Sequence, residues 1–301
     1  MQKEFFGVYA ALLTPFEEKG GVKEKGLRAL SRFLVAKGLH GLYICGSTGE
    51  GIFMTTEERM RVAEIVKDEI GNKAKIICHI GGATNTNEAV KLARHAAKIK
   101  MDGLSSIPPI YYQQNAEGIR NYYRTLAEST GLPFIMYYIP QTTGVTMTGQ
   151  NIADLAKIKN MTGIKYTGSD FYILQDLINK TGGKWNALSG PDEMFLPALT
   201  MGVDGSIGST QNCIPEVFLG IYESFMRGDI QTAMRLQRRV TEAVNITGKR
   251  GWVISRKTVL KFRGIDAGYS RAPLQVKLSA AEEKDLRSEW KKAFPEYSEA
   301  L

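Results

Sequence analysis

The sequence predicts a (β/α)₈ TIM barrel followed by an all-helical C-terminal extension. Short apolar runs alternate eight times with longer amphipathic segments within about 225 residues, which is the size expected of such a barrel. After the eighth pair the strands stop, and helical periodicity continues. A doubly wound open sheet is the alternative, but no GxGxxG motif follows the first expected strand.

The eight expected strands are short apolar runs, several of them bounded by glycine or proline. They cover residues 8–15, 41–45, 74–80, 103–107, 134–140, 162–167, 185–190 and 203–208. The expected helices carry apolar residues at three- and four-residue spacing, and Thr55 with Glu58 gives a capping-box pattern before the second helix. They cover residues 27–34, 58–70, 85–100, 117–129, 148–158, 170–179, 194–201 and 218–226.

Beyond the barrel, helices are expected at residues 230–247, 253–262 and 280–293, with no strands between them. No linker rich in proline, serine or glycine separates these helices from the barrel, so we expect them to pack on its side. The predicted division is therefore a barrel carrying the site, residues 1–227, and a helical extension, residues 228–301.

Composition excludes several classes of protein. The chain has 301 residues, 43% of them hydrophobic, and a net charge of +8, but its basic residues are dispersed along helix-like segments. The densest basic stretch, residues 249–263, is predicted to be a solvated helix face. We therefore expect no nucleic-acid partner, and only a modest attraction for small anions such as 2-oxo acids.

The N-terminus lacks a signal-peptide pattern, and no apolar run is long enough to cross a bilayer, so a cytoplasmic protein without a membrane partner is expected. Cys45, Cys78 and Cys213 are far apart in the sequence and lie next to apolar residues, so they are expected to be buried and reduced. The three histidines show no metal-ligand spacing. No metal site is expected.

Two expected strands end in chemically reactive side chains. Tyr137 lies in the fifth strand and Lys165 in the sixth, where both faces of a barrel strand are covered. Burial penalises an ammonium ion and leaves some free amine, which can attack a carbonyl carbon. The pattern indicates Schiff-base chemistry at Lys165, although a lysine at a strand end can also extend to solvent.

Other polar groups follow the carboxyl ends of strands, where barrel sites form. Ser47 and Thr48 lie in the glycine-rich loop 46–51, which is either an anion cradle or a tight βα turn. Tyr111 follows two prolines and could relay protons or pack in an interface.

The loops after the last two strands also carry polar groups. Asp192 and Glu193 follow Gly190 after the seventh strand, where acids also serve as ordinary helix caps. Ser209 adds a hydroxyl after the eighth strand. We expect these side chains and those of the earlier strand ends to meet in one site.

These motifs resemble the class I pyruvate-dependent lyase superfamily, which includes N-acetylneuraminate lyase and dihydrodipicolinate synthase. The matching segments are GSTGE at 46–50, the tyrosine strand ending at Pro140, Gly-Ile-Lys at 163–165 and Gly-Ser-Ile-Gly-Ser at 205–209. The resemblance covers essentially the whole chain and implies the same barrel with a helical extension.

The resemblance also implies a role for each residue. Lys165 forms an imine with pyruvate, so no separate cofactor is needed. Ser47 and Thr48 hold the pyruvate carboxylate, and Tyr137 moves a proton. The carbonyl of Ile207 lies beside the imine. Tyr111 resembles the tyrosine that family members lend to a neighbouring subunit's site, which implies an oligomer, typically a homotetramer.

Within the superfamily, the sequence is more similar to the neuraminate lyases. Dihydrodipicolinate synthases usually carry an arginine two residues after the proline of the tyrosine strand, whereas this chain has Thr142 there. The resemblance assigns binding of a polyhydroxylated substrate tail to Thr167, Gly190, Asp192, Glu193 and Ser209. Two departures from the branch are Tyr138, where an asparagine is common, and Pro191 inside the acidic loop.

The activity that the resemblance implies is a class I aldolase that reversibly cleaves N-acetylneuraminate, or a related sialic acid, to pyruvate and N-acetylmannosamine. Two alternatives stay open. One is another 2-oxo acid aldolase or dehydratase of the superfamily that acts on a deoxy sugar acid. The other is a catalytically silent barrel that binds a sugar acid.

Overall fold

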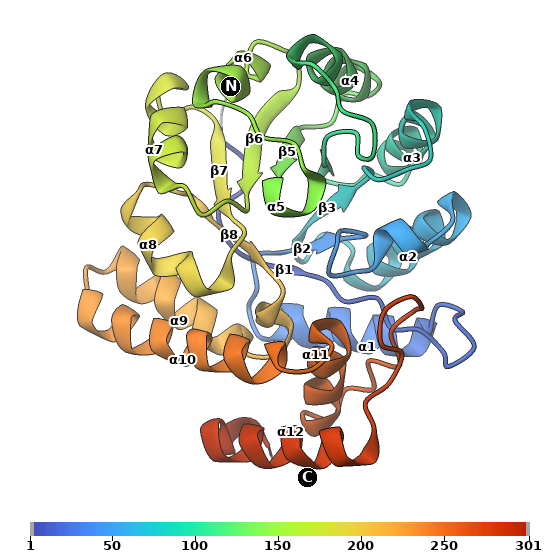
Figure 1. The fold of residues 1–301 in the computed structure, drawn as a ribbon, viewed down its shortest axis with the longest axis vertical. Coiled ribbons are helices and arrows are strands. Elements are labelled where there is room, and N and C mark those ends of the chain that lie inside the picture. Colours follow the sequence, from blue (N-terminus) through green and yellow to red (C-terminus); the bar gives the residue numbers. More distant parts are fainter. Residues whose placement is uncertain (1–2, 299–301) are drawn as a thin grey trace.

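In a computed structural model, which describes residues 3–298, the chain forms a closed barrel of eight parallel strands (Figure 1). Each strand pairs with the next and β8 pairs with β1, so the sheet has no edge. The strands are β1 (Gly7–Ala11), β2 (Gly41–Ile44), β3 (Lys75–His79), β4 (Gly103–Ser106), β5 (Phe134–Tyr138), β6 (Met161–Tyr166), β7 (Asn186–Ser189) and β8 (Gly205–Gly208). The predicted (β/α)₈ fold is confirmed.

Helices surround the barrel, and the predicted ones are all present with ends shifted by a few residues. They are α1 (Glu24–Ala36), α2 (Thr56–Ile70), α3 (Thr86–Lys98), α4 (Ala116–Glu128), α6 (Gly149–Leu155), α7 (Phe171–Lys180), α8 (Phe195–Thr200) and α9 (Pro215–Met226). The capping box predicted for α2 is present, because Thr55 Oγ1 accepts from the Glu58 amide and Glu58 Oε2 accepts from the Thr55 amide.

Several short elements were not predicted. Helix α5 (Pro140–Thr143) begins at a proline and ends at Gly144, whose φ of 68° only glycine adopts easily. Single 3₁₀ turns follow β2, β7 and β8 and precede the C-terminus. They are η1 (Gly51–Phe53), η2 (Asp192–Met194), η3 (Thr210–Asn212) and η4 (Pro295–Tyr297).

Strand β1 is shorter than the predicted range 8–15. The Leu12 amide still donates to the Tyr43 carbonyl of β2 at 2.9 Å, but the Leu13 amide donates to the side-chain oxygen of Asn212 at 3.2 Å. The strand therefore ends in a loop whose backbone is satisfied by a side chain from η3.

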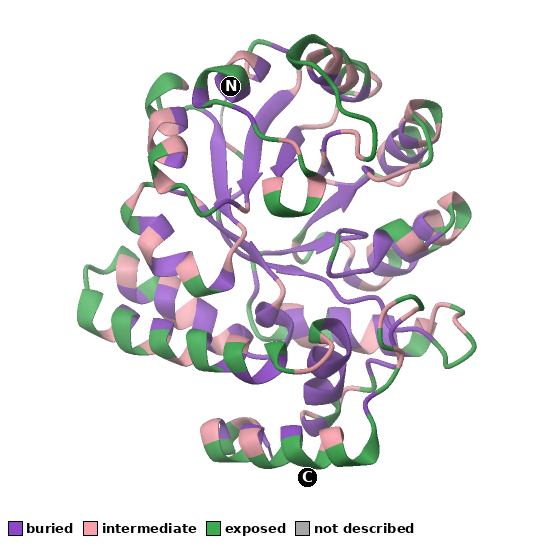
Figure 2. Cartoon of the chain, viewed as in Figure 1, coloured by how far each residue is buried: buried purple, intermediate pink, exposed green. Residues whose placement is uncertain are grey.

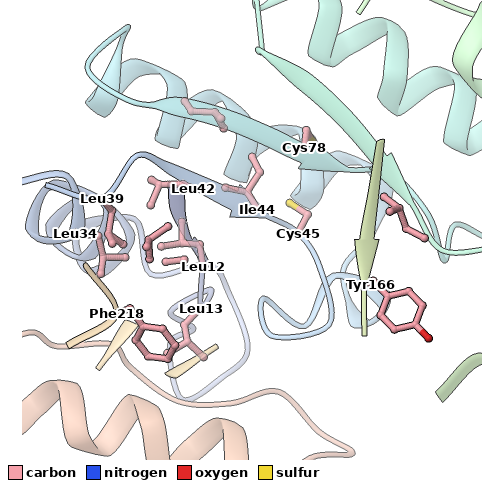
Figure 3. Packing of buried hydrophobic residues seen from close by; sticks show 14 of the residues in the cluster. Leu12, Leu13, Leu34, Leu39, Leu42, Ile44, Cys45, Cys78, Tyr166 and Phe218 are labelled. Carbon is pink, nitrogen blue, oxygen red and sulfur yellow. The ribbon is translucent and has the colours of Figure 1, made fainter. Parts of the chain in front are cut away.

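Buried residues make up the strands and parts of the surrounding helices (Figure 2), and they form two clusters that the barrel wall separates. An outer layer lies between the strands and the surrounding helices, and Figure 3 shows part of it where Leu12, Leu34 and Leu42 pack together. The inner layer fills the barrel itself. Its members include Tyr9, Tyr43, Ile77, Ile135, Tyr137, Leu188 and Ile207. The three cysteines are free and buried, as predicted.

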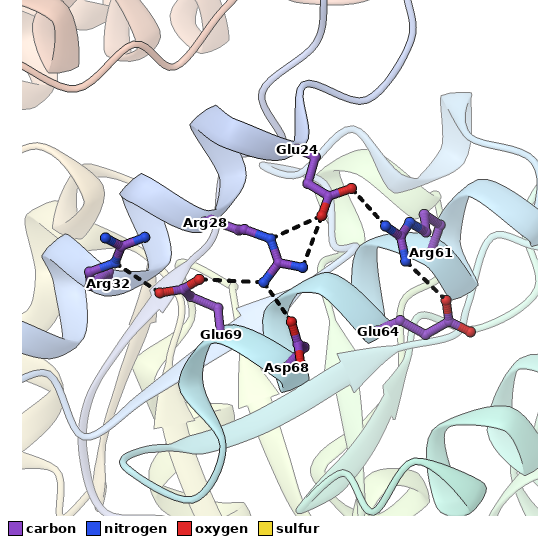
Figure 4. A network of polar contacts seen from close by, with 7 residues as sticks. All are labelled: Glu24, Arg28, Arg32, Arg61, Glu64, Asp68 and Glu69. Atoms are coloured by element: carbon purple, nitrogen blue, oxygen red, sulfur yellow. Dashed lines mark hydrogen bonds and ion pairs between the residues drawn. The ribbon is translucent and has the colours of Figure 1, made fainter.

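On the outer surface, α1 and α2 are joined by a network of ion pairs (Figure 4). Arg28 contacts Glu24 on its own helix and Asp68 and Glu69 on α2. Exposed pairs of this kind contribute little individually, so the apolar contacts beneath them hold the two helices.

The extension consists of α10 (Ile230–Gly248), α11 (Trp252–Phe262) and α12 (Ala280–Ala293). Helix α10 packs against α9 and α8, and α11 contacts α10, α12 and η3. The division at residues 227 and 228 stays a prediction. No helix within residues 3–298 combines the length and apolar character needed to span a membrane.

The prediction of a solvated basic face at residues 249–263 is wrong. Helix α11 is buried on nearly all sides, with Arg256 5% and Lys257 0% exposed. The charge of Lys257 is tolerated because the side chain pairs with Glu50 at 2.6 Å. Sequence periodicity could not reveal this pairing, because the partner lies far away in the chain.

Asn186, at the start of β7, ties the N-terminal segment to the barrel. Its Oδ1 accepts from the amides of Glu4 and Phe5 at 3.0 and 3.3 Å. Its Nδ2 donates to the Phe5 carbonyl at 2.8 Å and to Asp204 at 3.2 Å. This fully buried amide therefore satisfies groups from two other segments, the N-terminal residues and the turn before β8.

Replacing Asn186 with leucine is expected to lower the free energy of unfolding by about 3 kcal/mol, because buried backbone groups lose their partners. Urea denaturation followed by circular dichroism measures the change. Asn179→Leu, at the exposed end of α7, is the matched control and should change stability by less than about 0.5 kcal/mol. A similarly small effect at Asn186 would contradict the prediction.

Candidate functional site

Lys165 and Tyr137 lie side by side inside the barrel. The strand register pairs Tyr137 on β5 with Lys165 on β6. The Lys165 Nζ atom lies 4.1 Å from the ring centroid of Tyr137 and 4.5 Å from that of Tyr43. Lys165 is only 4% exposed, so its amine is buried between two aromatic faces and does not extend to solvent. The predicted lysine–tyrosine pair is present.

His79, at the end of β3, packs against both tyrosines and was missed in the sequence. Its ring centroid lies 5.9 Å from those of Tyr43 and Tyr137. The Ile107 amide donates to Nε2 at 3.2 Å, so Nδ1 carries the proton and donates to the Cys45 carbonyl at 3.2 Å. Burial lowers the pKa of His79 well below its usual value, and nearby Arg59 and Lys165 lower it further. The imidazole is therefore neutral.

The glycine-rich loop after β2 folds tightly because its ends adopt left-handed conformations, with φ of 59° at Cys45 and 56° at Glu50. Thr48 is buried and Ser47 is exposed. Within residues 3–298, the amides of Ser47 and Thr48 donate to no protein acceptor. Free amides in a tight turn can bind a carboxylate, so these two amides are available to an anion.

Five of the predicted binding residues line one pocket of about 380 Å³. These residues are Thr167, Gly190, Asp192, Glu193 and Ser209. Lys165, Tyr137, Ser47 and Thr48 are not among its lining residues. Because side chains of a strand alternate, Thr167 faces the same side as Lys165, about 7 Å further along the chain. The pocket therefore begins just beyond the lysine.

Close contacts shape this pocket. A Cβ atom at Gly190 would lie 1.7 Å from the Thr167 hydroxyl, so only glycine fits there. Asp192 Oδ2 accepts from the Ser209 amide at 3.1 Å, the Ser209 hydroxyl at 3.0 Å and the Thr210 amide at 2.8 Å. The buried Thr167 Oγ1 and Asp192 Oδ1 atoms find no partner among residues 3–298. Both are available to a ligand's hydroxyl groups.

Arg256 of α11 also lines the pocket and was not predicted. Its guanidinium donates to Thr210 Oγ1 at 3.1 Å and to the Trp252 carbonyl at 2.9 Å. The charge lies near Asp192 and Glu193, so it offsets the two carboxylates. No local pattern distinguished this arginine from a solvated helical one.

Tyr138 and Pro191 depart from the neuraminate lyase pattern in different ways. Tyr138 points outward and stacks on Tyr166, with ring centroids 5.4 Å apart, and its hydroxyl accepts from the Met147 amide. It supports the loop after β5 from outside the barrel. Pro191 lines the 380 Å³ pocket and precedes η2.

Tyr111 and Ile207 lie apart from that pocket. Tyr111 is 90% exposed, has a φ of 77° and packs edge-on against Tyr112. It borders a separate pocket of about 500 Å³ between α4 and the loop that precedes α6. Ile207 lies in the barrel interior, in the cluster that contains Tyr137.

The barrel and its site define a (β/α)₈ protein with a buried, tyrosine-flanked lysine near the carboxyl ends of the strands. The chain belongs to the dihydrodipicolinate synthetase family, whose sequence model matches residues 4–293. An N-acetylneuraminate lyase of Clostridium perfringens is 37% identical over 270 residues, which is 89% of this chain and 93% of that protein. The predicted superfamily is confirmed.

Solved structures agree with this assignment. A Clostridium difficile protein, CdNal in complex with mannosamine, matches with a TM-score of 0.91 and 34% identity over 98% of this chain and 100% of that one. A dihydrodipicolinate synthase from Aquifex aeolicus matches with a TM-score of 0.91 and 27% identity over 98% and 99% of the two chains. Both solved structures therefore share this fold.

The neutral state of His79 predicts a pH dependence of stability. Its folded-state pKa lies below the unfolded value of about 6.5, so the stabilisation is present above pH 6.5 and is lost as the pH falls toward the folded-state pKa. The unfolding free energy should fall by up to ~1.4 kcal/mol per pH unit in that range.

Urea denaturation between pH 8 and pH 5 tests this, with His79→Gln as the variant, since glutamine retains polar groups without titrating. The stability difference between wild type and variant should shrink by about 1 kcal/mol or more as the pH falls. His40 and His95 are present in both proteins and cancel in the comparison. Parallel curves would refute the assignment.

Proposed function

We propose that this protein is a class I aldolase that reversibly cleaves N-acetylneuraminate, or a closely related sialic acid, to pyruvate and N-acetylmannosamine. The observation that carries the proposal is the Lys165 amine held 4.1 Å from the Tyr137 ring centroid inside the barrel. The similarity to an N-acetylneuraminate lyase and the mannosamine complex of a similar structure support this choice of substrate.

In the cleavage direction, the Lys165 amine adds to the keto carbon of the substrate, and loss of water with uptake of one proton forms an iminium ion. Tyr137 relays the proton of the C4 hydroxyl to the substrate carboxylate, taking it on the phenol oxygen and giving up its own. The C3–C4 bond then breaks, its electrons pass into the iminium, and the aldehyde product departs. Protonation of the resulting enamine at C3 and hydrolysis of the imine release pyruvate and the free lysine.

The remaining predicted residues divide between the two ends of the substrate. Ser47 and Thr48 bind the carboxylate through free amides and hydroxyls, and the Ile207 carbonyl lies beside the imine. Thr167, Gly190, Asp192, Glu193 and Ser209 bind the polyhydroxylated tail, because carboxylates accept from several hydroxyls at once. The imine is covalent, so the proposal requires no cofactor and no metal.

Oligomeric state and location belong to the same proposal. Tyr111 is exposed and next to a pocket of about 500 Å³, which suits a side chain that reaches a neighbouring subunit. We propose a homotetramer in which Tyr111 completes the proton path of the neighbour's site. A cytoplasmic location, with small-molecule substrates as the partners, fits the same activity.

Replacing Lys165 with alanine is expected to abolish both turnover and the adduct that borohydride traps with pyruvate, because no other amine lies beside Tyr137 among the described residues. Intact mass and peptide mapping detect the adduct. Lys157→Ala, at an exposed position after α6, should retain both. Turnover by a folded Lys165→Ala protein would refute the mechanism.

Replacing Glu193 with glutamine tests the substrate tail. This exposed carboxylate lines the pocket of about 380 Å³ that is proposed to hold the substrate tail, the tail pocket. Its loss should raise the KM for N-acetylneuraminate about tenfold, which is roughly 1.4 kcal/mol. Trapping of pyruvate on Lys165 should be unchanged. Glu17→Gln, also exposed, is the control. An unchanged KM would favour the other superfamily activity, on a deoxy sugar acid.

A further inference from the structure

A buried ion pair joins the extension to the predicted anion cradle. The Lys257 Nζ atom of α11 lies 2.6 Å from Glu50 Oε1, and both side chains are fully buried. The same nitrogen donates to the Thr14 carbonyl at 2.7 Å and to the Tyr269 carbonyl at 2.6 Å. Three acceptors use all three protons of an ammonium group, so the geometry is that of a charged lysine.

Glu50 is held at its other oxygen as well. Oε2 accepts from the Arg271 amide at 2.7 Å, and the Arg271 guanidinium forms two bonds of 2.7 Å with Glu58 of α2. Burial lowers the pKa of Lys257 to about 8, which leaves the ammonium as the main form at neutral pH. Burial raises the pKa of Glu50, while the charge of Lys257 and the hydrogen bonds from Lys257 and Arg271 act to lower it.

These contacts fix both sides of the cradle. Glu50 is the residue in left-handed conformation that closes the turn after Ser47 and Thr48. Thr14, which follows β1, accepts from Lys257 through its carbonyl and donates from Oγ1 to the Gly49 carbonyl at 2.7 Å. One ammonium group thus joins the loop after β1 to the end of the cradle.

Stability alone is a weak reason for such a pair. Removing two charges from water costs several kcal/mol, and apolar residues of similar volume often stabilise a protein as well or better. The ion pair instead fixes the orientation of the backbone, because its hydrogen bonds hold Thr14 and Glu50 in place. An anion cradle depends on the orientation of its backbone amides, since they must all point at one carboxylate.

We propose that Lys257 is a positioning residue for the substrate carboxylate. Through Glu50 and Thr14 it fixes the turn so that the amides of Ser47 and Thr48 converge on that carboxylate. The inference rests on the proposed function and extends it, because it makes the helical extension part of substrate binding. Lys257 touches no substrate and acts only through the turn.

The test is a pyruvate titration of the borohydride-trapped adduct on Lys165, at a temperature at which circular dichroism shows each variant folded. Lys257→Met and Glu50→Gln should raise the pyruvate concentration for half-maximal trapping at least tenfold. The turnover number at saturating pyruvate in the condensation direction should fall less than threefold. Glu50→Gln is nearly isosteric, so it decides the question if Lys257→Met does not fold.

Two controls separate positioning from stability. Lys261→Met, four residues along the same helix and exposed, should leave half-saturation unchanged. Asn186→Leu should lose stability without weakening pyruvate binding. If half-saturation of folded Lys257→Met or Glu50→Gln rises less than tenfold, the inference is wrong while the aldolase proposal stands. If the wild type forms no adduct, both are wrong.

Discussion

Strand register in the closed barrel is the constraint on which the site depends. Tyr137, Lys165 and Leu188 occupy the same level on three adjacent strands, so their side chains enter the barrel together. A slip of one residue would turn Lys165 outward into the layer between sheet and helices. The closed barrel prevents such a shift in register, because every strand is paired on both sides.

The same geometry explains which parts of the site the sequence could predict. Lys165 lies near the end of β6, and Thr167, Gly190 and Ser209 follow β6, β7 and β8. Neighbouring strands of a barrel end close together, so chain order predicts that these residues are near one another. His79 also ends a strand, so the same rule could have found it. The spacing of the histidines along the chain argued against a metal site. It carried no information about the contact between the His79 ring and Tyr137.

Arg256 and Lys257 were beyond such reasoning for a physical reason. A helical stretch with dispersed charges is typical of a solvated face, and only tertiary contacts distinguish a buried one. The partner of Lys257 is Glu50, 207 residues away in the chain. Burial of α11 depends on η3, α10 and α12 packing around it at once, which no local pattern encodes.

The helical extension contacts the loops at both ends of the proposed substrate site. Lys257 holds the cradle through Glu50, while Arg256, its neighbour in the chain, bonds Thr210 beside the tail pocket. On α10, Gln237 donates to the Asp192 carbonyl at 3.2 Å. The loops after the strands make few contacts of their own. The positions of their side chains therefore depend on the helices that pack against these loops. The barrel sets where the reacting groups lie, and the extension limits how far the loops around them can move.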